Sequence, residues 1–403
     1  MHICFDTFGC RLNKAEALGD EARCIAKGHR IVDSHAEADL VIVRGCSVTA
    51  RAQRECEALV KHLRKHYPNK RVIVTGCLPG AQKLNIDPSG RGGASAKKAS
   101  PVPMRTSRAY LKVQDGCSRG CAFCIVPKFR GAPVSVPFDT AMDSAKRFID
   151  AGYSEIILTG CNLALYSDGS RRLPDLAAAI AEAFPGGRVR LGSVEPGPCA
   201  DELVDAMAGH ENICRSLHLS VQSGSDRILT LMRRRYTAGG VAELAAKARR
   251  LMPLLGLGCD LIAGFPGETE GDFRETKRLA VRCGFTNVHA FPFSERPGTA
   301  AATLPGRILP EIRHARAREL AAAAKEALRR FAANFTGKTV QIAVESVLPA
   351  AGWTSEHLWL EERLPPPSIG RAQAEALRRS LISFKVRTVK DGVLRGDRLA
   401  GRG

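Results

Sequence analysis

The chain has 403 residues, 14 cysteines, 44% hydrophobic residues and a formal net charge of +19. This length predicts two or three domains with real hydrophobic cores, and the sequence contains no stretch long and apolar enough to predict a membrane span. The N-terminus, MHICFDTFGC, lacks the basic start and long apolar run of a signal peptide, so we expect a soluble, cytoplasmic protein. In that reducing compartment the cysteines predict thiolate ligands rather than a disulfide framework.

The excess of basic residues indicates binding to a polyanion. Basic runs recur at residues 60–71, 232–235 and 307–330. A net positive charge can also serve solubility alone, or reflect a host whose proteins are basic in general. Of these interpretations we favour nucleic-acid binding.

The first predicted domain, residues 1–95, alternates strands with helices. Apolar runs and helical spacing of apolar residues predict strands at Ile3–Phe8, Leu40–Val43 and Val72–Val74, and helices at Asn13–Gly28 and Ala50–His66. This alternation predicts a small parallel α/β sheet.

Each of these three strands is followed almost at once by a Gly-Cys pair, which contains Cys10, Cys46 or Cys77. Ligands collect beyond the carboxyl ends of the strands in open α/β sheets, so three cysteines there can meet at one point. The preceding glycine lets the backbone turn sharply or approach a ligand closely. One such cysteine would usually be a core thiol, whereas three in register predict a metal centre. The other cysteines of this domain are interpreted as core residues: Cys4, Cys24 and Cys56.

A second set of cysteines lies in the stretch AYLKVQDGCSRGCAFCIVPKFRG, where Cys117, Cys121 and Cys124 have the spacing C-x3-C-x2-C. A tetrahedral zinc site would normally show two C-x2-C pairs, and this triplet has no local fourth Cys or His. Three thiolates on a 4Fe–4S cubane leave one iron open for a substrate or cofactor. A zinc knuckle or scattered core thiols are the alternatives.

This spacing, with the aromatic Phe123 before the last cysteine, resembles the radical S-adenosylmethionine (SAM) superfamily. The resemblance implies that the open iron of the 4Fe–4S cluster takes the amino and carboxylate groups of SAM.

In the central domain, residues 105–333, the sequence predicts six strands separated by alanine-rich helices. The predicted strands are Tyr110–Val113, Glu155–Leu158, Arg188–Val194, Leu217–Val221, Leu257–Ala263 and Asn287–Phe293. Six β/α units predict a partial parallel barrel, (β/α)6, rather than a full eight. Active sites of such barrels lie at the carboxyl ends of the strands.

Polar residues and glycines gather at those predicted strand ends. The candidates for contacts with SAM are Gly160, Glu195, Gln222, Arg234, Gly264 and Gly267. Carboxylate and amide side chains suit hydroxyl and amine groups, an arginine suits a carboxylate or phosphate, and glycines allow backbone contact with a flat base. Each candidate also has a structural alternative, a turn or a bond to a neighbouring loop. Cys161, which follows Gly160, is interpreted as an incidental thiol.

The last domain, residues 334–403, follows a long basic helix at Glu311–Arg330. Short alternating strands predict a small β-barrel: Thr339–Val347, His357–Leu360, Ser383–Thr388 and Gly392–Leu394. Residues suited to base stacking and phosphate contact are Trp353, Trp359, Lys385, Arg387 and Lys390. A merely structural barrel is the alternative.

Motifs along most of the chain resemble the methylthiotransferases, an iron–sulfur branch of the radical SAM enzymes. They are TFGCRLNKAEA, GCSVTARAQ, VTGC, RVRLGSVEP, HLSVQSGSDRILTLMRRRYT, GCDLIAGFPGET and HAFPFSERPGTAAA. The resemblance implies an auxiliary 4Fe–4S cluster on Cys10, Cys46 and Cys77, and an RNA-binding TRAM-type barrel at the end of the chain. MRRRYT and HAFPFSERPGT most resemble the subgroup that acts on threonylcarbamoyladenosine in tRNA.

The chain departs from that family in three places. Arg44-Gly45 stands where Asn-Thr is usual before the second cysteine, and Leu78 stands where Tyr or Phe commonly follows the third. The interval between Cys77 and Cys117 is short, and its Gly/Ser/Ala/Lys/Pro-rich sequence predicts a flexible linker at about residues 80–104.

The resemblance implies reductive cleavage of SAM to methionine and a 5′-deoxyadenosyl radical, and replacement of hydrogen by a methylthio group at carbon 2 of threonylcarbamoyladenosine beside the anticodon. It implies that the auxiliary cluster holds the sulfur to be inserted and that a second SAM supplies the methyl group, leaving S-adenosylhomocysteine. It also implies a reductant such as flavodoxin or ferredoxin. Isopentenyladenosine in tRNA, or a ribosomal protein, is the alternative substrate. An iron–sulfur RNA-binding protein without SAM turnover is the alternative of another class. The sequence leaves the oligomeric state open.

Overall fold

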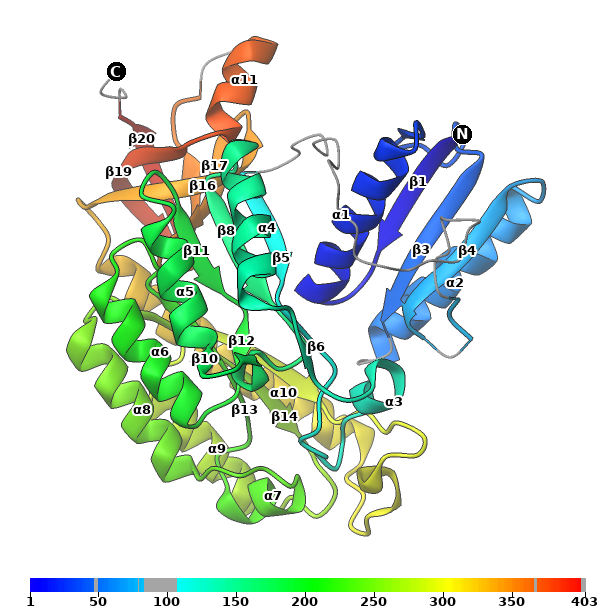
Figure 1. Ribbon diagram of the computed structural model, residues 1–403. Helices are drawn as coiled ribbons and strands as arrows, with labels where there is room; N and C mark the ends of the chain where they lie inside the picture. The colour runs from blue at the N-terminus through cyan, green and yellow to red at the C-terminus, as the bar shows by residue number, and fades with distance from the viewer. Residues whose placement is uncertain (47–49, 79, 83–106, 366–367, 400–403) are drawn as a thin grey trace. The chain divides into compact units, whose positions relative to one another are not determined.

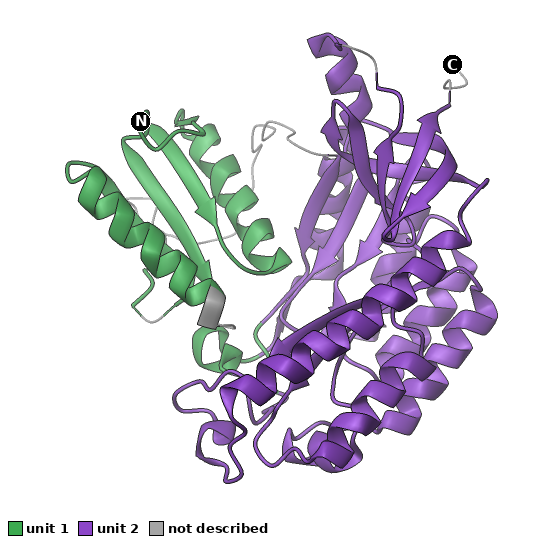
Figure 2. Cartoon of the chain, turned by 180° about the vertical axis from the view of Figure 1, so that it is seen from behind, with its two compact units in different colours: residues 1–104, 116–118, 125–132 green, residues 105–115, 119–124, 133–403 purple. Residues whose placement is uncertain are grey.

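The computed structural model describes residues 1–46, 50–78, 80–82, 107–365 and 368–399 (Figure 1). The chain divides into two compact units, coloured separately in Figure 2. Unit 1 comprises residues 1–104, 116–118 and 125–132, and unit 2 comprises residues 105–115, 119–124 and 133–403. Most of the predicted linker, residues 83–104, lies outside the described residues. No helix among the described residues is long and apolar enough to cross a membrane.

Unit 1 contains the predicted small parallel α/β sheet. Its strand order is β2-β1-β3-β4, and all the pairings are parallel. The elements are β1 (His2–Thr7), α1 (Arg11–Ala26), β2 (Arg30–Ile31), β3 (Leu40–Cys46), α2 (Ala50–His66) and β4 (Arg71–Cys77). The sequence missed β2 because two residues are too short to show an alternating pattern.

Each face of this sheet is covered by one helix. On one face Cys24 of α1 packs with Ile3, Leu40 and Ile42. On the other face Leu63 of α2 packs with buried residues that alternate with those on the strands. Burying one such aliphatic side chain stabilises the fold by about 1.5–3 kcal/mol. The helices therefore fix the sheet, and the carboxyl ends of its strands carry the three Gly-Cys pairs.

Unit 2 contains the predicted partial barrel of six β/α units (Figure 1). Its parallel strands are β5 (Arg108–Lys112), β8 (Glu155–Thr159), β11 (Arg188–Leu191) with β12 (Ser193–Val194), β13 (Ser216–Gln222), β14 (Gly256–Ala263) and β15 (Asn287–Pro292). The helices between them are α4 (Phe138–Asp150), α5 (Leu173–Glu182), α6 (Pro198–Gly209), α7 (Asp226–Leu231), α8 (Ala238–Leu251) and α9 (Glu270–Arg282).

The predicted strand Arg188–Val194 is two strands in the structure. β11 pairs with β8, whereas β12 pairs with β13, and Gly192 separates the two. The Gly192 N–H donates to the carbonyl of Leu158 at 2.9 Å, and a Cβ at position 192 would lie only 2.9 Å from the same oxygen. A side chain at position 192 would therefore clash with Leu158 at the point where pairing with β8 ends and pairing with β13 begins.

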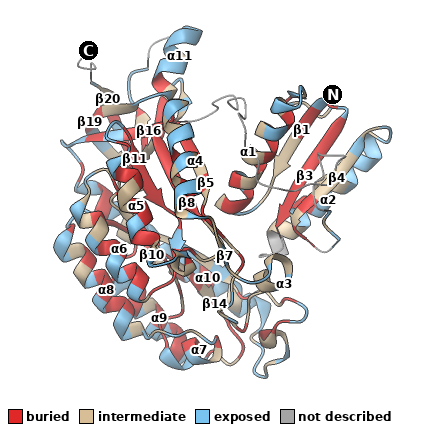
Figure 3. Ribbon diagram, viewed as in Figure 1, coloured by how far each residue is buried: buried red, intermediate tan, exposed pale blue. Residues whose placement is uncertain are grey.

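The two faces of the barrel strands differ in burial (Figure 3). Along β13 the residues Leu217, Leu219 and Val221 are buried in the main core with the helices, and the residues between them are partly exposed. β14 has the same pattern near its end, where Leu261 is buried and Asp260 is partly exposed. One strand face therefore supports the helices and the other faces the lumen of the partial barrel.

The end of the chain forms the predicted small β-barrel. It is closed, with the order β16-β17-β18-β20-β19, and has its own apolar core. Its elements are β16 (Thr339–Val347), β17 (Ala350–Thr354), β18 (Trp359–Glu362), α11 (Arg371–Arg378), β19 (Leu381–Lys390) and β20 (Val393–Arg398), and α10 (Pro310–Ala333) precedes them. The predicted strands omit β17, and the Ala/Arg-rich segment between β18 and β19 is the helix α11.

A buried ionic cluster joins this terminal β-barrel to the partial barrel within unit 2. Glu155 is fully buried and accepts hydrogen bonds from Nε of Arg188 at 2.6 Å and Nε of Arg190 at 2.7 Å. Arg188 also donates to the carbonyl of Trp353 at 2.6 Å, and Arg190 to that of Thr354 at 2.7 Å. Because these guanidinium groups are shared between the two barrels, they fix the orientation of one on the other.

Candidate functional site

The Cys117, Cys121 and Cys124 loop runs from β6 (Gln114–Asp115) to α3 (Val126–Arg130). All three thiols are partly exposed. The loop starts at Gly116, whose φ is +66° and where a Cβ would overlap the carbonyl of Ala132, so only glycine fits there. The backbone conformation at Gly116 therefore defines the start of the loop. The three cysteines are partly exposed and are not packed in a hydrophobic core.

Arg234 lies against this loop in unit 2. Its Nη1 donates to Sγ of Cys121 at 3.1 Å, and its Nη2 donates to the carbonyl of Ser220 at 3.0 Å. Its Nε donates to the hydroxyl of Tyr236 at 2.7 Å. Burial lowers the pKa of Arg234, but Tyr236, Cys121 and Glu195 outweigh that effect and raise it above its usual value. A fixed guanidinium therefore lies beside one thiol of the loop.

Glu195 is the second predicted residue in this group. It is 5% exposed and accepts hydrogen bonds from Nε of Arg119 at 2.7 Å and Nδ2 of Asn162 at 2.8 Å. It also forms an ion pair with Arg234 at 3.5 Å. The structure thus brings Glu195, Arg234 and Cys121 together, and it adds Arg119 and Asn162, which the sequence analysis did not single out.

The three predicted glycines have structural reasons for lacking a side chain. A Cβ on Gly160 would lie 2.9 Å from Cβ of Gln114, and one on Gly264 would overlap the side chain of Arg313. Gly264 and Gly267 have φ of +73° and +81°, in the left-handed region that favours glycine. Backbone contact with a flat base stays a prediction for these positions.

Gln222 is the last residue of β13 and has a φ of +69°. This left-handed conformation is unfavourable for a residue with a side chain and costs about 1–3 kcal/mol. Such strain is typical of residues held for function. Contact of Gln222 with a ligand stays a prediction.

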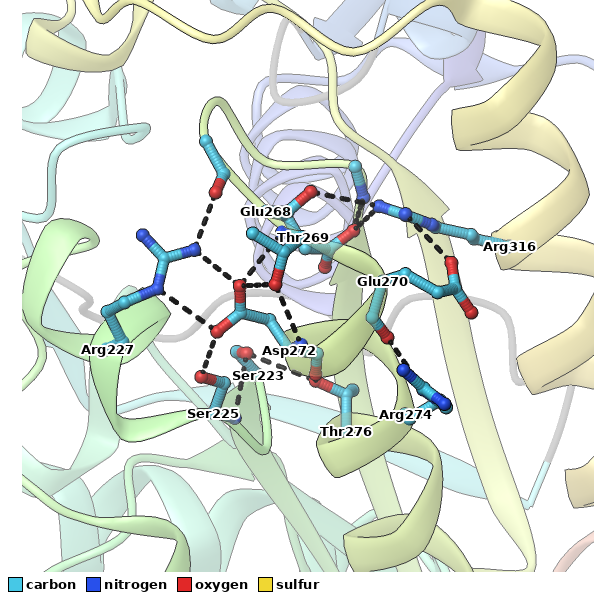
Figure 4. Close-up of polar contacts among 12 residues, drawn as sticks. Ser223, Ser225, Arg227, Glu268, Thr269, Glu270, Asp272, Arg274, Thr276 and Arg316 are labelled. Atoms are coloured by element: carbon cyan, nitrogen blue, oxygen red, sulfur yellow. Dashed lines mark hydrogen bonds and ion pairs between the residues drawn. The ribbon is translucent and has the colours of Figure 1, made fainter.

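A polar network holds the loops after β13 and β14 (Figure 4). Oδ1 of Asp272 accepts from Oγ of Ser225 at 2.6 Å, and Oδ2 accepts from the backbone N–H of Thr269 at 2.8 Å. Arg227 hydrogen-bonds to Asp272 and donates to the carbonyl of Gly267 at 2.6 Å. Burial raises the pKa of Asp272, but the bonds from Arg227, Ser225 and Thr269 outweigh it and hold the pKa well below its usual range.

A second carboxylate fixes the start of the same loop. Oε2 of Glu268 accepts from the backbone N–H of Gly264 at 2.7 Å and from Nη1 of Arg316 at 2.7 Å (Figure 4). Burial raises the pKa of Glu268, and these two donors offset part of the rise. Gly264 and Gly267 are therefore held by two buried carboxylates, which keep this strand end rigid.

In unit 1 the cysteines at the strand ends lie close together. Cys46 and Cys77 are neighbouring residues at the ends of the paired strands β3 and β4. A Cβ on Gly9 would lie 2.9 Å from Sγ of Cys46, so the Gly9-Cys10 turn packs directly on that thiol. Burial raises the pKa of Cys77, and the charge and hydrogen bond of Arg130 offset part of that rise. Three thiols at one sheet edge form a donor set suited to an iron–sulfur cluster.

Two residues orient this edge. Asn13 is fully buried and donates to the carbonyls of Phe8 at 2.8 Å and Gly45 at 2.9 Å, so it ties together the ends of β1 and β3. Arg130 of α3 donates to Sγ of Cys77 at 2.9 Å and to Oε1 of Glu16 at 2.8 Å. Neither residue was predicted, although the motif TFGCRLNKAEA contains Asn13 and the stretch AYLKVQDGCSRGCAFCIVPKFRG contains Arg130.

Two of the departures from the family pattern, Gly45 and Leu78, are in contact with each other. A Cβ on Gly45 would overlap the side chain of Leu78, which is 6% exposed and fills the space above that glycine. Arg44 is 7% exposed and forms ion pairs with Glu16, at 2.8 Å, and with Asp20. Leu78 and Arg44 are therefore both packed or paired next to the strand ends that carry Cys46 and Cys77.

Comparison with known proteins agrees with these observations. Residues 111–280 match the model of the radical SAM superfamily, and residues 2–90 match a family described as uncharacterized protein family UPF0004. Among solved structures, the radical SAM methyltransferase TsrM of Kitasatospora setae superposes with a TM-score of 0.55 at 14% identity, covering 75% of each chain. The fold and the cysteine loop thus define a radical SAM enzyme.

Comparison with curated relatives identifies the family within this superfamily. The threonylcarbamoyladenosine tRNA methylthiotransferase MtaB of Chlamydia pneumoniae is 32% identical over 361 residues, which is 84% of this chain and 86% of the relative. The tRNA-2-methylthio-N(6)-dimethylallyladenosine synthase of Cereibacter sphaeroides is 33% identical over 382 residues, with the same coverage. The chain belongs to the methylthiotransferase family of radical SAM enzymes. Membership implies a 4Fe–4S cluster and SAM as cofactors.

Proposed function

We propose that this protein inserts a methylthio group at carbon 2 of threonylcarbamoyladenosine next to the anticodon of tRNA. The observation that carries the proposal is the pair of cysteine triplets, one in the Cys117 loop and one at the strand ends of unit 1. The relatives from Chlamydia pneumoniae, Thermotoga maritima and Rickettsia prowazekii, which are named for this reaction, support the choice of nucleoside.

The two triplets have separate roles in this proposal. Cys117, Cys121 and Cys124 would hold the 4Fe–4S cluster that binds SAM, and Cys10, Cys46 and Cys77 would hold an auxiliary 4Fe–4S cluster. When bound, these groups would supply one-electron chemistry and the sulfur to be inserted, and a second SAM would supply the methyl group, leaving S-adenosylhomocysteine. An aromatic C–H bond offers neither an acidic proton nor a leaving group, so radical chemistry suits this target.

The residues of the chain position these groups. Arg234 donates to Cys121 and carries a fixed positive charge that suits the carboxylate of SAM. Glu195, held by Arg119 and Asn162, is placed to accept from amino or hydroxyl groups. Asp272 and Glu268 keep the loop with Gly264 and Gly267 rigid, so that the backbone can lie along the adenine.

The terminal β-barrel is proposed to hold the tRNA. The Trp353 and His357 rings are stacked with centroids 4.3 Å apart, and Trp359 lies edge-on to Trp353 at 5.1 Å. Such a cluster offers a stacking surface for bases, and Lys385, Arg387 and Lys390 would contact phosphates. The net charge of +19 predicts that the affinity falls steeply with salt.

A second candidate substrate is dimethylallyladenosine in tRNA. The Cereibacter sphaeroides relative, named for that reaction, is 33% identical, which is close to the values for the other subgroup. The cofactors and the cysteine ligands are the same in both candidates. Either reaction needs an electron donor, for which a flavodoxin or ferredoxin is proposed.

Reconstituted enzyme tests the proposal. With SAM, a reductant and tRNA that carries threonylcarbamoyladenosine, we expect 5′-deoxyadenosine and the methylthio nucleoside. The enzyme should hold about eight iron atoms, and about four when Cys10, Cys46 and Cys77 are replaced by alanine. SAM cleavage without a methylthio product on threonylcarbamoyladenosine would contradict the proposal.

A further inference from the structure

Three polar side chains meet on the lumen face of the partial barrel, away from the strand-end site. Nε2 of His218 lies 3.0 Å from Oδ1 of Asp260, and Nδ1 of His289 lies 3.1 Å from the same oxygen. The two imidazole rings are 4.7 Å apart, with a tilt of 35°. We refer to His218, Asp260 and His289 as the lumen cluster.

The register of the strands places this cluster inside the barrel. Asp260 on β14 is opposite His289 on β15, and His218 on β13 is opposite Gly258. The alternate residues Leu219, Cys259 and Leu261 are buried in the core with the helices. Side chains on the other face of these strands, including the lumen cluster, therefore point away from the helices and into the lumen.

The lumen face is open at this position. The side chain of His289 is 50% exposed, and Phe291, two residues further along the same strand face, is 38% exposed. In a closed barrel these positions would be packed as interior core. Phe291 therefore provides an apolar surface beside the polar side chains of the cluster.

The lumen cluster lies below the strand ends. Asp260 precedes Gly264 by four residues and His218 precedes Gln222 by four, which corresponds to about 13 Å along a strand. A nucleoside that reacts at the strand ends could thus extend a substituent down to the cluster. Phe291 lies between the two levels on β15, with its ring 6.2 Å from that of His289.

The chemistry of the cluster suits a polar ligand. Burial raises the pKa of Asp260, but the bonds from His218 and His289 outweigh it and keep the pKa well below its usual range. With Nδ1 of His289 donating to this carboxylate, Nε2 accepts from a hydroxyl group when the ring is neutral. In the imidazolium form Nε2 donates to a carboxylate.

We propose that the lumen cluster determines substrate specificity by receiving the N6 substituent of the target adenosine and selecting a hydroxyl- and carboxylate-bearing group over an apolar one. This inference rests on the proposed function. A threonylcarbamoyl group can bond to His289, whereas a dimethylallyl group would cover the cluster without bonding to it. A site built to hydrogen-bond its ligand discriminates strongly against an analogue that lacks the polar groups.

The variant His289→Phe tests the inference in the cluster-loaded enzyme. The measurement is kcat/KM for two tRNAs, one with threonylcarbamoyladenosine and one with dimethylallyladenosine. We expect the ratio of the two values to fall at least tenfold toward the apolar substrate. His289→Gln, which keeps a polar side chain, should change the ratio by less than about threefold. His210→Phe is the matched control, because His210 is paired with a single carboxylate, that of Glu182 at 3.4 Å.

Three results would overturn the inference. The first is an unchanged ratio in His289→Phe, and the second is an equal loss on both tRNAs in His289→Phe and His289→Leu. The third is one equivalent of a divalent metal in the wild-type enzyme that His289→Phe loses, since the three ligand atoms lie within 4.8 Å of one another. The activity of the wild-type enzyme on tRNA with threonylcarbamoyladenosine tests the proposed function. A lack of this activity is therefore distinguishable from each of the three results above.

Discussion

Nη1 of Arg234 donates a hydrogen bond to Sγ of Cys121, while Nη2 of the same guanidinium lies 3.5 Å from the carboxylate of Glu195. One arginine therefore links a proposed cluster ligand to a proposed SAM contact. Both partners are parts of unit 2, and the helix α7 and the strand β12 that precede Arg234 and Glu195 are packed in its core.

Replacing Arg234 by methionine removes a positive charge and a donor to a cluster sulfur. Because both stabilise the more negative, reduced cluster, we expect its reduction potential to fall and reductive SAM cleavage to slow by tenfold or more, on the order of 1.4 kcal/mol. The measurement is a redox titration followed by electron paramagnetic resonance. Arg235→Met is the matched control, because Arg235 is exposed. Equal potentials in both variants would falsify this role.

Replacing Asp272 by asparagine removes the charge that binds Arg227 and Thr269 after β14. We expect the Kd for SAM to rise roughly tenfold, because a hydrogen bond to a charged group contributes about 1.5–3 kcal/mol and part of the network remains. Isothermal titration with cluster-loaded enzyme measures this. Glu275→Gln on the exposed face of α9 should bind SAM like the wild type. An unaltered Kd in Asp272→Asn would show that the network does not hold the SAM site.

Replacing Glu155 by glutamine should loosen the junction of the two barrels. The change leaves Arg188 and Arg190 buried without their counter-charge, and breaking a buried ion pair typically costs about 3–5 kcal/mol. Hydrogen exchange of β8 and β11 measures the loss. The exposed Glu182→Gln is the control, and the same protection in both variants would contradict the prediction.

The lowered pKa of Glu155 also predicts that the junction of the two barrels loses stability at low pH. Burial raises the pKa of Glu155, but Arg190, Arg188 and Arg108 outweigh it, so the folded pKa lies well below the usual 4.5. A lowered folded pKa contributes stability that is present above pH 4.5 and is lost as the pH falls below that value. We expect protection of β8 to be constant from pH 7 to 5 and to decline below about pH 4.5. A decline that starts near pH 6 would point to another group.

Gly45 and Leu78 should show strong coupling in unit 1. Gly45→Thr overpacks the space that Leu78 fills, and we expect about 1–3 kcal/mol of destabilisation. Leu78→Ala in the same chain should relieve the part that comes from Leu78, while Sγ of Cys56, 2.7 Å from the same Cβ position, keeps the rest. The measurement is hydrogen exchange of β3 and β4 in the two single variants and the double variant. Gly19→Ala in α1, where a Cβ makes only an ordinary contact, is the control. Additive effects would show that the two positions are independent.

The sequence predicted most of the fold because its periodicity is strong. The strands at Glu155–Thr159 and Gly256–Ala263 are mostly apolar and lie in the parallel sheet, and their ends were placed within one residue. It missed the two-residue strand Arg30–Ile31 and the strand Ala350–Thr354, and it did not foresee the break at Gly192. Those features depend on pairing with distant strands, which local patterns do not report.

Local sequence patterns also predicted part of the site, and they missed the residues whose roles depend on distant contacts. Cysteine spacing and strand-end position pointed to both triplets, and the structure places Glu195 and Arg234 together. Arg119, Asn162 and Arg130 were missed, because their roles come from contacts with residues 33 to 114 positions away along the chain. The lumen cluster was missed although three of the quoted motifs contain His218, Asp260 and His289, because the three residues come from different strands and only strand pairing brings them together.

The most direct test is mass spectrometry of tRNA nucleosides from a strain with and without the gene. We expect the methylthio form of threonylcarbamoyladenosine to disappear without the gene and to return with the wild-type gene. It should not return with a gene that encodes alanine at Cys117, Cys121 and Cys124. Loss of the methylthio dimethylallyl nucleoside alone would move the assignment to the second candidate. Unchanged levels of both nucleosides would contradict the proposed function.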